Sequence, residues 1–110
     1  MMQVSTHVND ADLAQALQQY VERRLHFALS RFGGRVGQVT VRISSDSPAT
    51  SRCRISTEVM PFGRVAVEES DPDLFTAVDR ATGRIGRLFG RELERYRDAR
   101  VGRESVRTAA

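Results

Sequence analysis

The spacing of apolar residues alternates between two periods along the chain, and the order of these changes limits the possible folds. Apolar residues at every second position are typical of a half-buried strand, and steps of three or four are typical of an amphipathic helix. The strand period occurs at 2–8, 38–43, 52–59 and 65–67. The helical period occurs at 10–32 and at 72–97. The sequence therefore predicts the order strand, helix, three strands, helix.

The boundaries of these elements follow from local turn and cap chemistry. Gly33-Gly34 predicts the end of the first helix, because glycine accepts the left-handed conformation that closes a helix. The polar segment 44–51 is typical of a loop, and Pro61-Phe62-Gly63 of a turn. Asp71 is expected to cap the second helix, with Pro72 in its first position. Residues 98–110 lack periodicity and are predicted to form a mobile tail.

The helix between the first two strands must return the chain parallel to the first strand, and the later short connections favour antiparallel pairs. We therefore predict an α+β fold, β-α-β-β-β-α, with a four-stranded mixed sheet and two helices packed on one face. At 110 residues the chain has room for one domain, which we place at 2–97.

Composition excludes several classes of protein. The content of 40% hydrophobic and 28% charged residues is that of a soluble globular protein. No segment approaches the roughly 18 apolar residues of a membrane span, and the start of the chain has no signal-peptide pattern, so a cytoplasmic location is expected. Cys53 is the single cysteine, which excludes an intrachain disulfide and a cysteine-rich metal site. Its alternation with Arg52 and Arg54 predicts a buried thiol.

The sequence contains no recognisable catalytic constellation. His7 and His26 lie on different predicted elements, without a group of carboxylates at metal-ligand spacing. Glu68 and Glu69 are neighbours on a strand and face opposite ways, so they do not form an acid/base pair. Phosphate-binding loops and nucleotide fingerprints are absent. We expect neither an enzyme nor a metal or other cofactor.

The second helix carries the most specific feature, a row of arginines. All 17 basic residues of the chain are arginine, and the net charge is +3. Five of them fall on an arc of about 80° beside the apolar stripe. They are Arg80, Arg84, Arg87, Arg91 and Arg95. Like charges in one row repel unless anions are near, which favours a phosphate-binding surface over an ordinary charged helix face.

The first helix offers a companion surface in which arginine and aromatic residues alternate. Tyr20, Arg24, Phe27 and Arg31 follow one face, and Arg23 flanks them. Arginine and aromatic side chains suit contacts with phosphates and bases, and the two helices could border one groove. Alternatively, Tyr20 and Phe27 pad the edge of the core. The predicted RNA-binding residues are Arg23, Arg24, Arg31, Arg80, Arg84, Arg87, Arg91 and Arg95.

Three glycines, Gly83, Gly86 and Gly90, share one side of the second helix, which we expect to face outward. Each costs up to about 1 kcal/mol of helix stability relative to alanine. Close approach of another backbone, of RNA or of a protein, would explain them, and so would neutral drift.

The segments 16–25, 31–32 and above all 71–79 (DPDLFTAVD) resemble the ribosome hibernation-promoting factor family, also called ribosome-associated inhibitor A or protein Y. The similarity covers about 2–97. It implies a domain on the small ribosomal subunit, in the channel for messenger and transfer RNA, that silences or protects idle ribosomes under stress. It also implies ribosomal RNA contacts for the basic residues Arg24, Arg31, Arg84, Arg87 and Arg91.

The sequence departs from the family pattern in several places. Phe27 stands near a usually basic position, the three glycines replace usually polar ones, and the segment 44–51 lacks basic residues. The dimerising extension of long family members is missing, so we expect a short form that is monomeric off the ribosome. The competing hypothesis is a diverged domain that binds a protein partner through the glycine-arginine face of the second helix.

Overall fold

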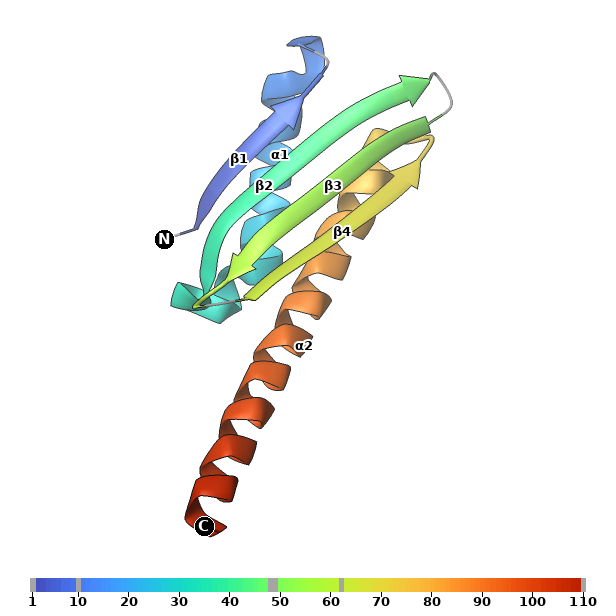
Figure 1. Cartoon of the computed structure of the whole chain (residues 1–110). Helices are drawn as coiled ribbons and strands as arrows, with labels where there is room; N and C mark the ends of the chain where they lie inside the picture. The colour runs from blue at the N-terminus through green and yellow to red at the C-terminus, as the bar shows by residue number, and fades with distance from the viewer. Residues whose placement is uncertain (1, 10, 48–49, 62, 110) are drawn as a thin grey trace.

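A computed structural model of the chain describes residues 2–9, 11–47, 50–61 and 63–109. The predicted order of elements is confirmed (Figure 1). The elements are β1 (Gln3–Val8), α1 (Ala11–Leu29), the short 3₁₀ helix η1 (Ser30–Arg35), β2 (Val36–Ser47), β3 (Thr50–Val59), β4 (Gly63–Asp71) and α2 (Leu74–Ala109).

The four strands form one mixed sheet in the order β1-β2-β3-β4. β1 runs parallel to β2, with Val4 opposite Val39, because α1 carries the chain back across the sheet. β2, β3 and β4 are antiparallel neighbours, with Ile55 opposite both Val41 and Val67. Both helices lie on the same face of the sheet (Figure 1), so the predicted α+β architecture is confirmed.

The core lies between this face and the two helices. Its largest fully buried side chains include Leu17 and Leu25 of α1 and Ile85 and Phe89 of α2. Cys53 points into the same core and is fully buried, as predicted, and burial raises the pKa of its thiol to about 12. The opposite face of the sheet is polar and uncovered, as the alternating pattern requires.

Two predicted boundaries are wrong because backbone pairing continues where the hydrophobic signal stops. The segment 44–51, expected to be a loop, belongs mostly to strands: β2 runs to Ser47 and β3 begins at Thr50. Backbone pairing continues through these polar residues, with a shift of register between Ser45 and Ser47. α1 ends at Leu29 rather than at Phe32, and the chain continues as η1, in which Gly33 takes a positive φ of 56°. Phe62, in the expected turn at 61–63, lies outside the described residues.

The second helix begins later than predicted. β4 extends to Asp71, and Asp73 rather than Asp71 caps α2. The Asp73 carboxylate accepts hydrogen bonds from the backbone N–H of Thr76, at 3.3 Å, and from its hydroxyl, at 2.7 Å. Asp71 instead accepts a hydrogen bond from the backbone N–H of Asp73, at 2.9 Å, which orders the turn before the helix.

The second helix also ends later than predicted. α2 continues past Arg97 to Ala109 and projects beyond the sheet (Figure 1). The segment after Arg97 contains no proline and one glycine, Gly102, so the backbone can stay helical without an apolar stripe. The mobility of residues 98–110 stays a prediction. Neither helix of the described chain is long and apolar enough to span a bilayer.

Candidate nucleic-acid interface

The two helices cross closely because α2 presents glycine to α1. Gly86 is buried, and a Cβ atom added there would lie 3.2 Å from the carbonyl oxygen of Ala28. A Cβ at Gly90 would lie 3.6 Å from the ring of Phe32. The expectation that these glycines face outward is therefore wrong for Gly86 and Gly90. The glycine side of α2 lies between its core stripe and its arginine row. The backbone of Ala28 in α1 approaches Gly86, and the ring of Phe32 in η1 approaches Gly90.

Beside this crossing lies a hollow of about 250 Å³, which we call the α1–α2 groove. The structure thus brings Arg87 of the predicted arginine row together with Arg24, Phe27 and Arg31 of the companion surface along one groove. Residues of both helices and of η1 line it: Arg24, Phe27 and Ala28 from α1, Arg31 from η1, and Thr82, Gly83, Gly86 and Arg87 from α2. Gly83 has no side chain that could fill the groove. A Cβ atom added there would have one neighbour within 4 Å, the guanidinium of Arg87 at 3.7 Å, so the space above Gly83 is open.

The two aromatic residues of α1 differ in their surroundings. Phe27 is 85% exposed, so the alternative that it pads the core is wrong for this residue. Tyr20 packs against the core and makes an edge-to-face contact with Phe75, with ring centroids 5.1 Å apart, so that alternative holds for Tyr20. A second depression, of about 360 Å³, lies between Tyr20, Arg23, Arg24 and Phe27. Phe27 therefore lines both hollows.

Asp79 of α2 joins the helices at one end of the groove, and sequence reasoning missed it. Its Oδ1 accepts a short hydrogen bond from the hydroxyl of Tyr20 and lies 3.2 Å from Nε of Arg24. The hydrogen bond to Asp79 raises the pKa of Tyr20 above its ordinary value. Arg24 is thus held in place, but Asp79 neutralises part of its charge.

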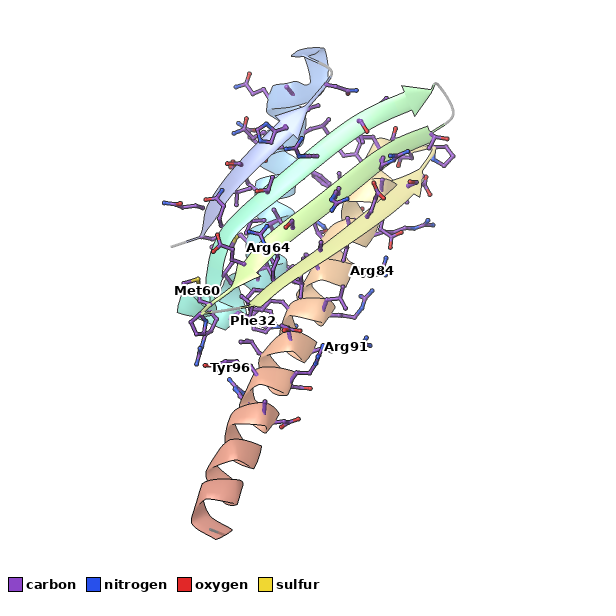
Figure 2. All side chains as sticks on the ribbon, in the orientation of Figure 1. Phe32, Met60, Arg64, Arg84, Arg91 and Tyr96 are labelled. Atoms are coloured by element: carbon purple, nitrogen blue, oxygen red, sulfur yellow. The ribbon has the colours of Figure 1, made fainter. Side chains whose placement is uncertain are left out.

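The arginine row of α2 is exposed along its whole length, as predicted, but acidic partners divide it. Figure 2 shows Arg84 and Arg91 projecting from α2. Three of the five arginines are paired: Arg80 with Asp71 at 3.2 Å, Arg84 with Glu69 at 3.2 Å and Arg95 with Glu92 at 3.6 Å. Arg87 and Arg91 have no acidic partner among the described residues.

A signal for two of these pairs was present in the sequence. Residues two apart on a strand face the same way, so Glu69 and Asp71 continue the side of β4 that carries Val67. That side faces the helices, which places both carboxylates beside the start of α2. The sequence alone did not give the distance between them and the arginine row.

Arg31, on the other wall of the groove, is positioned by aromatic contacts. Its guanidinium carbon lies 4.8 Å from the ring centroid of Phe32, which stacks on Phe89 with centroids 4.6 Å apart. Arg23 and Arg31 are exposed and have no acidic partner in the described part of the chain. Four arginines are therefore available to an anion: Arg31 and Arg87 in the groove, Arg23 in the neighbouring depression and Arg91 one turn further along α2.

The uncovered face of the sheet carries arginines as well, in a different setting. Arg42 and Arg54 are directly opposite each other on β2 and β3. Arg52 lies 3.7 Å from Glu68, and Arg64 donates a hydrogen bond to Ser56 at 3.1 Å. This face provides a control for the groove, since its arginines are exposed on the side of the sheet away from Phe27 and the α1–α2 groove, although Arg42 lines a separate hollow with residues of β1.

Within the described residues, no three histidine, cysteine, aspartate or glutamate side chains are grouped so that they could hold a metal ion. The carboxylates near the groove, Asp79, Asp71 and Glu69, are each engaged with arginine. The chemistry of the groove is that of anion and aromatic contact.

A small mixed sheet with both helices on one face defines the class of this domain, and solved structures share it. The N-terminal domain of Thermus thermophilus Protein Y matches with a TM-score of 0.70 and 28% identity, over 82% of this chain and 98% of that one. A ribosomal subunit interface protein from Coxiella burnetii matches in fold, with a TM-score of 0.72 and 13% identity over 86% of this chain and 99% of that one. A search of curated protein sequences gives no significant match.

The family follows from the sequence itself. The family described as Sigma 54 modulation protein / S30EA ribosomal protein matches residues 4–100, nearly the whole chain. The chain belongs to this family, and the resemblance drawn from residues 71–79 is confirmed.

Proposed function

We propose that this protein binds the small ribosomal subunit through ribosomal RNA, in the messenger and transfer RNA channel, and keeps idle ribosomes silent under stress. Membership of a ribosomal protein family supports ribosome binding in general. The names of the similar structures, a Protein Y domain and a ribosomal subunit interface protein, support the same partner. The protein acts by occupying its site rather than by catalysis, in the cytoplasm where ribosomes are, and is a monomer when free.

The observation that carries the proposal is the set of unpaired arginines around the α1–α2 groove. Arg31 and Arg87 on opposite walls of the groove, Arg23 in the depression beside it and Arg91 one turn further along α2 leave four guanidinium groups without an acidic partner in the described chain. Guanidinium matches phosphate with a planar fork of donors, and phosphate neutralisation releases counterions from RNA. A groove with cations on both walls therefore suits a nucleic-acid backbone.

The paired arginines extend this surface at lower strength. Arg80, Arg84 and Arg95 form exposed ion pairs, which typically contribute about 0–1 kcal/mol. Phosphate can replace such carboxylate partners at small cost. Arg24 remains near the groove, although Asp79 holds it. The eight arginines predicted from sequence thus form one proposed surface with an unpaired centre.

Co-sedimentation with small ribosomal subunits, at low and high salt, tests this proposal. Changing Arg84, Arg87 and Arg91 to glutamate should abolish co-sedimentation while the circular dichroism spectrum stays unchanged. The matched triple change of Arg42, Arg52 and Arg64 to glutamate, on the other face of the sheet, should do much less. Equal losses from both triples would mean that net charge alone matters, and unchanged binding by the helix triple would refute the surface.

The competing hypothesis, a protein partner on the glycine-arginine face of α2, loses part of its basis. Gly86 and Gly90 face Ala28 and Phe32 of the same chain, so they are not free to admit a partner's backbone. Arginines remain exposed on that face, and they suit phosphate equally well.

A further inference from the structure

Phe27 is an unusual side chain for its surroundings. It is 85% exposed, more than the other exposed large hydrophobic side chains of the described residues, Met60, Phe75 and Tyr96. It stands on the wall of the α1–α2 groove and lines the neighbouring depression. Its contribution to the core is small, because its ring is left almost entirely in water. A role in binding accounts for its position better than a role in folding.

Cationic groups surround this ring on several sides. Arg23 and Arg24 share the depression with Phe27, and Arg31 and Arg87 share the groove with it. The groove holds about 250 Å³, roughly the liquid volume of eight water molecules. Gly83 and Gly86 add no side chains to its floor. A flat, apolar group that carries a nearby negative charge would complement this arrangement.

We propose that Phe27 stacks on an unpaired RNA base while Arg31 and Arg87 hold the phosphates beside it. This inference rests on the proposed function and specifies the kind of RNA that the groove prefers. Bases in a duplex are stacked on one another and cannot offer a face to a protein ring, whereas bases in loops and bulges can. The groove should therefore favour a bulge or single strand over a continuous helix.

A protein ligand fits the same surroundings less well. An apolar side chain packed on Phe27 would remove water from several arginines that have no acidic partner in the part of the chain that the structure describes, Arg23 and Arg31 among them. Burial of unpaired charge opposes association. A nucleotide brings its own phosphate to these arginines, so it satisfies both the ring and the charges.

Fluorescence anisotropy with two short RNA hairpins, each closed by a non-nucleotide linker so that the loop contains no unpaired base, tests the inference. The hairpins have the same stem, and one carries a single unpaired adenosine. Phe27→Leu keeps an apolar side chain and removes the ring, so affinity for the bulged hairpin should fall by about 5- to 160-fold, the range of one base–aromatic stack. Affinity for the fully paired hairpin should stay within about twofold. Phe27→Trp, which keeps an aromatic face, should retain the preference for the bulge.

A second variant fills part of the groove without removing the ring or any charge. Gly83→Leu places a side chain into the open space above Gly83, so it should lower the affinity for the bulged hairpin in the same way. Circular dichroism establishes that each variant is folded. We expect both variants to fold, because Phe27 is exposed and the space at Gly83 is open.

The salt dependence separates this inference from the proposed function. Phe27→Leu should leave the slope of log affinity against log salt unchanged, whereas Arg87→Ala should flatten it by about one unit. Equal losses on both hairpins, or no loss on either, would overturn base stacking while the arginine slope still reports RNA binding. Loss of ribosome binding by Phe27→Leu with both hairpin affinities unchanged would show that the ring contacts a protein and would also overturn the inference.

Discussion

The division of the α2 arginine row predicts that neighbouring arginines contribute unequally to RNA binding. Arg80 and Arg87 are both exposed on the same helix. Arg80 lies 3.2 Å from Asp71, whereas Arg87 has no acidic partner among the described residues. Arg87→Ala removes one uncompensated charge from the groove. Arg80→Ala removes a charge that Asp71 already balances, so it should change the salt dependence much less.

The magnitude follows from counting the unpaired groups. If Arg23, Arg31, Arg87 and Arg91 each neutralise one phosphate, the log–log salt slope is about −3.6, at about 0.9 per phosphate of a duplex. Affinity then falls about 150-fold between roughly 50 and 200 mM salt. Arg87→Ala leaves three contacts and a slope of about −2.7, so the same change of salt lowers affinity about 40-fold.

Titration of a fluorescent RNA hairpin over this salt range measures the slopes directly. Arg42→Ala, on the uncovered face of the sheet, is the control for loss of one positive charge away from the groove. All three variants should keep their stability within about 0.5 kcal/mol, since the substituted side chains are exposed. A slope flattened as much by Arg80→Ala or Arg42→Ala as by Arg87→Ala would refute the role assigned to pairing.

Three further predictions concern the fold and are checked by chemical denaturation. Gly86→Leu should destabilise the protein by about 1–3 kcal/mol, because the new side chain would meet α1 at Ala28. Gly83→Ala should instead stabilise the protein by up to about 1 kcal/mol. Equal effects of the two substitutions would contradict the helix crossing. Asp73→Ala should lower the free energy of unfolding by about 1 kcal/mol, and Asp73→Ser should lower it much less. No effect of Asp73→Ala on stability would exclude the role of Asp73 as the helix cap. The pKa of Cys53 is raised to about 12 from 9.0, so the unfolded chain loses this proton first. Between pH 8 and 10 the free energy of unfolding of the wild type should therefore fall by about 1.4 kcal/mol more than that of Cys53→Val. Parallel pH profiles of stability for the two proteins would contradict a buried thiol.

Much of this fold could be predicted from the sequence because the relevant signals are local. Alternation of apolar and polar residues requires one buried and one wet face, which identified the four strands and placed Cys53 in the core. The helical stripes identified α1 and α2, and the helix between the first two strands required their parallel pairing. The exposure of the arginine row followed from its angle to the core stripe. The ends of β2 and β3 could not be predicted in this way, because the residues that pair there, Ser47 and Thr50, are polar and do not continue the apolar alternation.

Contacts between distant residues were decided only by the tertiary structure. Periodicity shows which side of α2 is buried, but it does not show on which flank α1 lies. That choice turned Gly86 toward Ala28 and left Arg87 at the edge of a groove. It also joined Tyr20 to Asp79 across 59 positions of sequence. Such pairs depend on how two helices rotate and cross on the sheet, which is set by the fit of all their side chains together rather than by any one segment.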